Sequence, residues 1–188
     1  MTYYERNLPH RHPAGKSIFV TWRLFGSVPR TVMIRIKSSG NVPGKRFLVF
    51  DECLESAKCG PLWLLDGMIA GYVREALIRG AEFEQYRLHA WVLMPNHVHA
   101  LLEPRVALRR FTASLEGVSA RNANATLGRV GEPFWQDESF DRWIRDSSQF
   151  ERVRSYIEQN PVKAGLAKKP EDWLWSSARQ YSVFKPGF

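Results

Sequence analysis

Residues 84–103 read EQYRLHAWVLMPNHVHALLE, and this stretch decides the fold. Its two halves, 84–94 and 97–103, are rich in apolar, β-branched and aromatic residues, which predicts two strands. Pro95 and Asn96 lie between them and are typical of a turn. We therefore expect a β-hairpin near the middle of the chain.

The segments on either side of the hairpin predict the remainder of an α+β fold. In chain order they are a strand over 17–25, an amphipathic helix over 66–79 that Gly80 ends, a helix over 107–127, a strand over 134–144, and a helix over 147–159 that Asn160-Pro161 ends. The full order is strand, helix, hairpin, helix, strand, helix. This order predicts a central antiparallel sheet with helices packed on one face.

The length of 188 residues fits one domain spanning 1–188. We expect a basic, irregular N-terminal segment over 1–16 and an aromatic C-terminal tail over 168–188. Residues 26–46, rich in Gly and Pro, read as mostly loop with an edge strand at 31–37.

The composition, with 44% hydrophobic and 13% aromatic residues, allows a sizeable core and argues against disorder. No apolar stretch is long enough to span a membrane, and the first residues lack the apolar segment of a secretory signal. Two cysteines, Cys53 and Cys59, cannot form a disulfide scaffold. These features predict a cytoplasmic globular protein without a membrane partner.

The net charge of +8 is concentrated at one end of the chain. Residues 1–50 contain nine basic residues and one acid, Glu5, whereas basic and acidic residues balance over 51–188. A basic N-terminal third favours a polyanionic partner, most often nucleic acid. A basic surface that only maintains solubility is the alternative explanation.

His97-Val98-His99 in the second hairpin strand is a candidate metal site. Side chains alternate along a strand, so both imidazoles should lie on one face, about 7 Å apart along the chain. Two imidazoles on one face can share a divalent cation, although a pair of partly exposed histidines without a metal would give the same pattern. A second pair, His10 and His12, lies between prolines outside the predicted strands and is a weaker candidate.

Tyr156 and Asn160 in the last predicted helix are four residues apart and therefore share a helical face. A phenol and an amide on one face could serve as nucleophile and metal ligand. Taken alone, a tyrosine near a helix end more often packs against the core.

Several segments together resemble one family. They are NLPHRHPAG (7–15), FVTWRL (19–24), MPNHVHALLEP (94–104), FWQDESFDRWIRD (134–146), YIEQNPVKAGL (156–166) and DWLWSSA (172–178). Their order resembles the single-tyrosine HUH transposases, which include the insertion-sequence IS200-like enzymes, and more closely the REP-associated tyrosine transposases of bacteria. The resemblance covers most of the chain and is weakest over 26–64.

The resemblance implies a ferredoxin-like α+β fold and metal-dependent cleavage and rejoining of single-stranded DNA near hairpins. His97 and His99 match the metal-binding pair, Tyr156 matches the catalytic tyrosine, and Asn160 matches the position of a third metal ligand. The implied cofactor is Mg²⁺ or Mn²⁺, which stabilises charge on the phosphate. A 5′-phosphotyrosine is the implied intermediate, and a monomer is favoured over a dimer.

The basic N-terminal region then has a role in binding DNA phosphates. The candidate contacts are Arg6, Arg11, Lys16, Arg23 and Arg30. Two other functions fit the same residues. One is a hairpin-binding regulator that lacks catalysis, and the other is a metal-dependent hydrolase in which water attacks and Tyr156 only packs.

Overall fold

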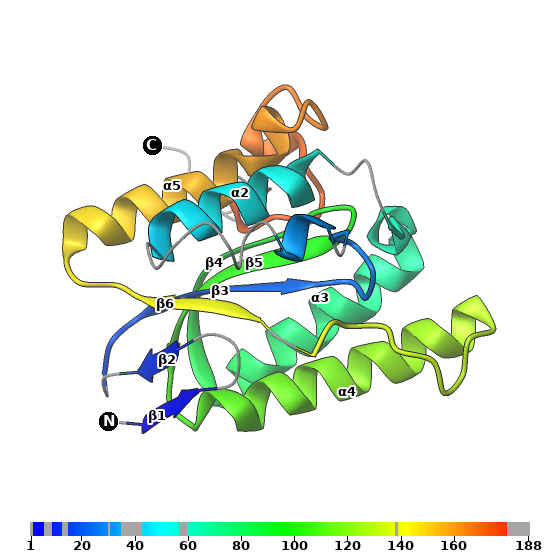
Figure 1. Cartoon of the computed structure of the whole chain (residues 1–188), viewed down its shortest axis with the longest axis horizontal. Helices are drawn as coiled ribbons and strands as arrows, with labels where there is room; N and C mark the ends of the chain where they lie inside the picture. Colours follow the sequence, from blue (N-terminus) through cyan, green and yellow to red (C-terminus); the bar gives the residue numbers. More distant parts are fainter. Residues whose placement is uncertain are drawn as a thin grey trace, which may run out of the picture.

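The computed structural model places the hairpin at the centre of a four-stranded antiparallel sheet (Figure 1). The residues that it describes are 2–5, 9–12, 15–29, 31–34, 43–56, 60–137 and 139–179. The strand order is β4-β5-β3-β6, and the strands are β3 (Ile18–Arg23), β4 (Tyr86–Leu93), β5 (His97–Pro104) and β6 (Phe140–Trp143). The predicted hairpin is confirmed as β4 and β5, with Leu93 opposite Val98.

Two helices cover one face of this sheet: α3 (Gly67–Glu82) and α4 (Leu108–Leu127). The elements β3-α3-β4-β5-α4-β6 follow the βαββαβ order of ferredoxin-like folds. Alternate residues of β5, Val98, Ala100 and Leu102, face the apolar core beneath these helices. The predicted α+β sandwich with an antiparallel sheet is therefore confirmed.

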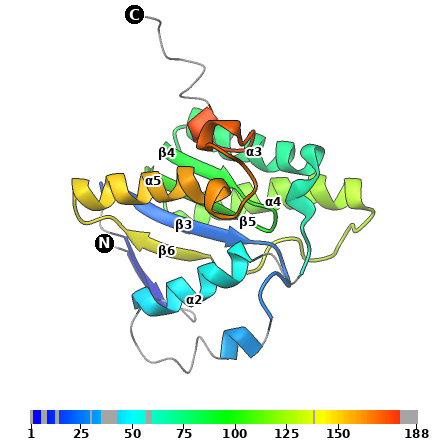
Figure 2. The same ribbon diagram turned by 90° about the horizontal axis from the view of Figure 1, so that it is seen from above.

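Two further helices lie over the opposite face (Figure 2): α2 (Pro43–Glu55) and α5 (Ser147–Lys163). The expectation that the helices pack on one face of the sheet is therefore wrong, because the sheet is covered on both. A second apolar cluster joins α5 to the sheet through Phe19, Leu101 and Ile157. His97 and His99 lie on this same face because they alternate with the residues directed toward α3 and α4. The helices added to the ferredoxin-like core thus enclose the histidine pair.

The expectation that Gly80 ends the helix predicted over 66–79, which is α3, is wrong. Asp66 caps α3 as its Oδ1 accepts from the backbone of Met68 at 2.8 Å, and the helix continues through Gly80 to Glu82. A Cβ on residue 80 would lie 2.3 Å from the Tyr86 hydroxyl. The glycine makes room for Tyr86, whose hydroxyl donates a hydrogen bond to the carbonyl of Leu77 at 2.6 Å.

The last helix is also longer than expected. It begins at Ser147, is capped by Asp146, and continues through Pro161 to Lys163. Proline lacks only its own N–H, and the last turn closes as the carbonyl of Asn160 accepts from Ala164 at 3.0 Å. Asn160-Pro161 therefore lies inside α5 and does not end it.

Other segments differ from the expected local structure. Residues 31–34 are helical where an edge strand was expected, and the predicted strand over 134–144 is reduced to β6. Residues 2–5 and 9–12, expected to be irregular, form a small antiparallel pair, β1 (Thr2–Glu5) and β2 (Pro9–His12), which includes His10 and His12.

The C-terminal segment follows the outer edge of β4. The backbone N–H of Leu93 donates to the carbonyl of Trp175 at 2.8 Å, and the indole of Trp173 donates to the carbonyl of Leu93 at 2.9 Å. Only the part of the aromatic tail up to residue 179 is described. Among the described helices, none is both long and apolar enough to cross a membrane.

Candidate active site

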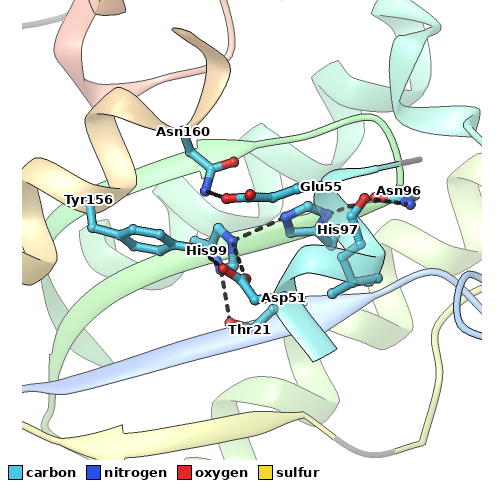
Figure 3. Close-up of polar contacts among 9 residues, drawn as sticks. Thr21, Asp51, Glu55, Asn96, His97, His99, Tyr156 and Asn160 are labelled. Atoms are coloured by element: carbon cyan, nitrogen blue, oxygen red, sulfur yellow. Dashed lines mark hydrogen bonds and ion pairs between the residues drawn. The ribbon is translucent and has the colours of Figure 1, made fainter. Parts of the chain in front are cut away.

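The histidine pair of β5 is completely buried between the sheet and α2 (Figure 3). The Nε2 atoms of His97 and His99 lie 3.0 Å apart, so the two rings converge through the same atom. Burial lowers the pKa of His97 to about 3, and burial together with the charge of His97 lowers the pKa of His99 well below its usual value. Both imidazoles are therefore neutral at physiological pH and can offer a lone pair.

The other ring nitrogen of each histidine has its own polar partner. The Nδ1 of His97 lies 2.6 Å from Asn96 Oδ1, and the Asn96 amide nitrogen donates to the carbonyl of Leu54. This fixes the amide orientation, so His97 carries its proton on Nδ1 and presents the Nε2 lone pair. The Nδ1 of His99 lies 2.8 Å from the hydroxyl of Thr21, which can accept or donate and so permits either tautomer.

Asp51 of α2 adds a carboxylate to this pair. Its Oδ1 lies 3.4 Å from His99 Nε2, and Asp51, His97 and His99 offer ligand atoms that all lie within 4.8 Å of one another. The Oδ1 atom is buried and accepts no hydrogen bond from any residue that the structure describes. The sequence reasoning missed Asp51, which belongs to the segment 26–64 where the resemblance is weakest.

The separations within this cluster fit a divalent cation. Two nitrogen ligands at a right angle about an ion, each about 2.1 Å from it, lie about 3 Å apart, and the two Nε2 atoms are 3.0 Å apart. The unpartnered Asp51 oxygen supplies the anionic ligand that hard cations prefer. The donor set of two neutral imidazoles and one carboxylate can therefore hold a divalent ion.

Tyr156 reaches this cluster from α5. Its hydroxyl donates a hydrogen bond to Asp51 Oδ2, and its ring meets the rings of His99 and Phe19 edge-on, with centroids 5.5 and 6.0 Å away. Burial, followed by the charge of Asp51, raises the pKa of the phenol. Burial raises the pKa of Asp51 to about 7, although its hydrogen bond with Tyr156 acts in the opposite direction.

Asn160 lies one turn beyond Tyr156 on the same helix and is fully buried. Its Nδ2 donates to Glu55 Oε1 at 3.1 Å, and its Oδ1 has no hydrogen-bond partner among the described residues. Glu55 lies between Asn160 and His97 in Figure 3. Asp51 is the carboxylate whose oxygen groups with the two histidine nitrogens, and the role of Asn160 as a ligand stays a prediction.

The expected DNA-binding residues are spread over different surroundings. Lys16 is exposed, and Arg11 lies in β2. Arg23 is buried, where its guanidinium donates to Gln136 Oε1 at 3.3 Å and lies 5.5 Å from the centre of the Phe50 ring. Arg6 and Arg30 fall outside the described residues.

Comparison with known proteins finds REP-associated tyrosine transposases. The curated protein of that name from Escherichia coli (strain K12) is 26% identical over 106 residues, which are 56% of this chain and 62% of the relative. The chain spans less than two thirds of the length of the curated relatives that it matches. A solved structure of a REP-associated tyrosine transposase bound to a REP hairpin has a TM-score of 0.58 at 18% identity. It covers 98% of this chain and 87% of the other, which shows a shared fold.

The sequence pattern that describes IS200-like transposases also matches this chain. It covers residues 63–160, more than half of the chain, and includes the histidine pair, Tyr156 and Asn160 but not Asp51 or Glu55. The ferredoxin-like sheet, the paired histidines of β5 and the tyrosine of α5 all accord with this match. The chain therefore belongs to the IS200-like transposase family.

Proposed function

We propose that this chain cleaves and rejoins single-stranded DNA next to hairpins, with Tyr156 as the nucleophile. The observation that carries the proposal is a continuous line of contacts, in which the Tyr156 hydroxyl donates to Asp51 and Asp51 lies 3.4 Å from His99. Family membership and the REP hairpin bound by the structural relative support DNA hairpins as the substrate. The chain acts as a single domain over residues 1–188, with a monomer favoured.

The reaction exchanges one ester of a backbone phosphate for another. The Tyr156 oxygen attacks the phosphorus, the bond from phosphorus to the 3′-oxygen breaks, and the 3′-oxygen leaves with a proton taken from solvent. Asp51, whose pKa burial raises to about 7, first loses its own proton, and the phenolic proton then passes to the ionised carboxylate at Oδ2, which already accepts its hydrogen bond. A 5′-phosphotyrosine and a free 3′-hydroxyl result.

Rejoining reverses these steps. A 3′-hydroxyl attacks the phosphotyrosine and loses its proton to solvent, the new phosphodiester forms, the bond from phosphorus to the Tyr156 oxygen breaks, and Tyr156 recovers its proton from Asp51. No nucleotide triphosphate is needed because the covalent link conserves the energy of the phosphodiester. The buried phenol requires a proton acceptor in contact because burial raises its pKa above the ordinary value for tyrosine, near 10.

Asp51, His97 and His99 would hold Mg²⁺ or Mn²⁺, and we propose the unpartnered Oδ1 of Asn160 as a further ligand atom. When bound, such an ion stabilises the negative charge that develops on the phosphate oxygens. Asn96 and Thr21 orient the two imidazoles through Nδ1, so Nε2 would be the ligand atom of His97, and also of His99 in the tautomer that carries its proton on Nδ1.

The N-terminal basic residues Arg6, Arg11, Lys16 and Arg30 are proposed to contact phosphates. Arg23, the last residue of β3, is buried against the ring of Phe50 in α2. We therefore expect its side chain to hold α2 against the sheet and its positive charge to add to the electrostatic potential of the site.

A covalent trapping experiment tests the proposal. The full chain is incubated with Mg²⁺ or Mn²⁺ and a pool of single-stranded hairpin oligodeoxynucleotides with randomised flanks, and adducts are detected on a denaturing gel. Wild type should form a DNA–protein adduct. Tyr156→Phe should form none while it still binds the hairpins.

The two alternative functions give different results in the same experiment. Binding without cleavage or adduct in the wild type indicates a hairpin-binding regulator. Metal-dependent cleavage that persists in Tyr156→Phe without an adduct indicates a hydrolase that uses water. Either outcome would overturn Tyr156 as nucleophile.

A further inference from the structure

The solvent-facing side of α5 carries a stripe of residues next to Tyr156. Arg152, Tyr156, Gln159 and Lys163 are spaced by four, three and four residues and so share one side of the helix. A pocket of about 420 Å³ opens along this side. Its lining residues are Glu151, Arg152, Ser155, Tyr156, Gln159 and Lys163.

Lys163 lies against the nucleophile itself. Its ammonium nitrogen is 4.8 Å from the centre of the Tyr156 ring, whereas His99 and Phe19 meet the same ring edge-on from the sheet. The charge of Lys163 also acts on Asp51, where it opposes the rise in pKa that burial causes. The exposed ammonium therefore lies on the side of the Tyr156 ring that borders the pocket.

The two cations that line the pocket, Arg152 and Lys163, differ from Arg154 on the same helix in their ion pairing. Arg154 lies 3.8 Å from a carboxylate oxygen of Glu151 and 3.7 Å from one of Glu158. In the part of the chain that the structure describes, Arg152 and Lys163 form no such ion pair, and Arg152 donates instead to the hydroxyl of Ser148 at 2.6 Å. Two cations on either side of the phenol therefore remain available for an external anion.

We propose that this pocket binds backbone phosphates of the single strand on both sides of the phosphate that Tyr156 attacks. Lys163 and Arg152 supply charge-assisted hydrogen bonds to phosphate oxygens, and Ser155 and Gln159 supply neutral donors between them. The strand then runs along α5 with its scissile phosphate at the phenol. This inference rests on the proposed function because it assigns a path to the DNA of the same site.

The salt dependence of DNA binding tests this path. Each phosphate contact to a single strand contributes about 0.7 to the slope of log K against log salt concentration. The full chain carrying Tyr156→Phe, which cannot form a covalent adduct, is titrated with fluorescein-labelled oligo(dT) at several salt concentrations. Adding Lys163→Gln or Arg152→Gln should each lower the slope by about 0.7, and Lys163→Arg should retain it.

Arg79→Gln is the matched control, since Arg79 is an exposed cation of α3 on the opposite face of the sheet. It removes one charge and should leave the slope unchanged. Equal slopes for Lys163→Gln and Arg79→Gln would overturn the phosphate path, whether or not the wild type forms an adduct. If Lys163→Gln and Arg152→Gln lower the slope but the wild type forms no adduct, the proposed phosphate contacts are supported and the transposase chemistry is refuted.

Discussion

Tyr156 on α5 donates its hydroxyl proton in a hydrogen bond to Asp51 on α2, a residue 105 positions earlier in the chain. The contact between Asn160 and Glu55 repeats this arrangement one helical turn further along both helices, with the same sequence separation. Two residues four apart on α5 thus face two carboxylates four apart on α2. The two helices are held in register over the histidine pair by polar contacts.

The first prediction concerns the metal. If Asp51 is a ligand, Asp51→Ala should weaken Mn²⁺ binding more than tenfold, as His97→Ala should, because each removes one donor from a small set. Electron paramagnetic resonance of free Mn²⁺ during titration measures this. Glu52→Gln changes an exposed carboxylate in the same turn of α2 and should leave the affinity unchanged. Equal affinities for Asp51→Ala and Glu52→Gln would remove Asp51 from the metal site.

The second prediction concerns the paired contact of Asn160 and Glu55. Asn160→Asp places two carboxylates against each other and should destabilise the fold. Glu55→Gln alone removes the carboxylate that accepts the hydrogen bond of Asn160 and should also destabilise the fold. The double variant restores an amide and a carboxylate in reversed positions. Urea denaturation should then give a favourable coupling energy of about 1 kcal/mol between the two sites. Strict additivity of the two single changes would show that the contact does not form in solution.

The alternation of β5 was enough to predict which side chains share a face. The period of two along a strand places His97 and His99 together whatever the rest of the chain does, and the structure agrees. Helical spacing likewise placed Tyr156 and Asn160 on one face of α5. Local periodicity therefore predicted both halves of the candidate site without predicting that they meet.

Asp51 could not be found in the same way. Its segment, PGKRFLVFDECLE, begins with proline at the first helical position and has apolar residues at helical spacing, which is the signal that could have identified α2. Even so, a helical pattern does not say which turn lies over which strand. The position of α2 over the sheet depends on tertiary contacts between residues far apart in sequence, such as the contact of the Arg23 guanidinium with the Phe50 ring.

The third prediction compares the effects on stability of alanine substitutions at two glycines of α3. Gly80→Ala would place a Cβ 2.3 Å from the Tyr86 hydroxyl, so Tyr86 has to move and the hydrogen bond to Leu77 is lost. We expect a loss of about 2–3 kcal/mol in the free energy of unfolding. Gly71→Ala, in the same helix, meets nothing within 4 Å and should gain about 0.5–1 kcal/mol from helix propensity. Thermal and urea unfolding of both variants measure the contrast, and a neutral Gly80→Ala would contradict the tight packing.

The fourth prediction uses the pKa of Asp51, which burial raises from 3.8 to about 7. The folded chain keeps this proton up to about pH 7, whereas the unfolded chain loses it near 3.8. The stability that Asp51 contributes is therefore fully present below pH 3.8 and is lost as the pH rises through 7. Asp51→Asn cannot ionise and has no such dependence.

The difference in unfolding free energy between wild type and Asp51→Asn should consequently shift in favour of the wild type by about 2 kcal/mol when the pH falls from about 7 to about 5. Urea denaturation in the presence of EDTA measures it without bound metal. Both proteins keep His97 and His99, whose low pKa destabilises the fold in acid, so that contribution is common to the two. A difference that stays constant, or that shifts toward Asp51→Asn at the lower pH, would mean that the carboxylate is already ionised in the folded chain. Asp51 would then meet Tyr156 as an anion and could accept the phenolic proton without first losing its own.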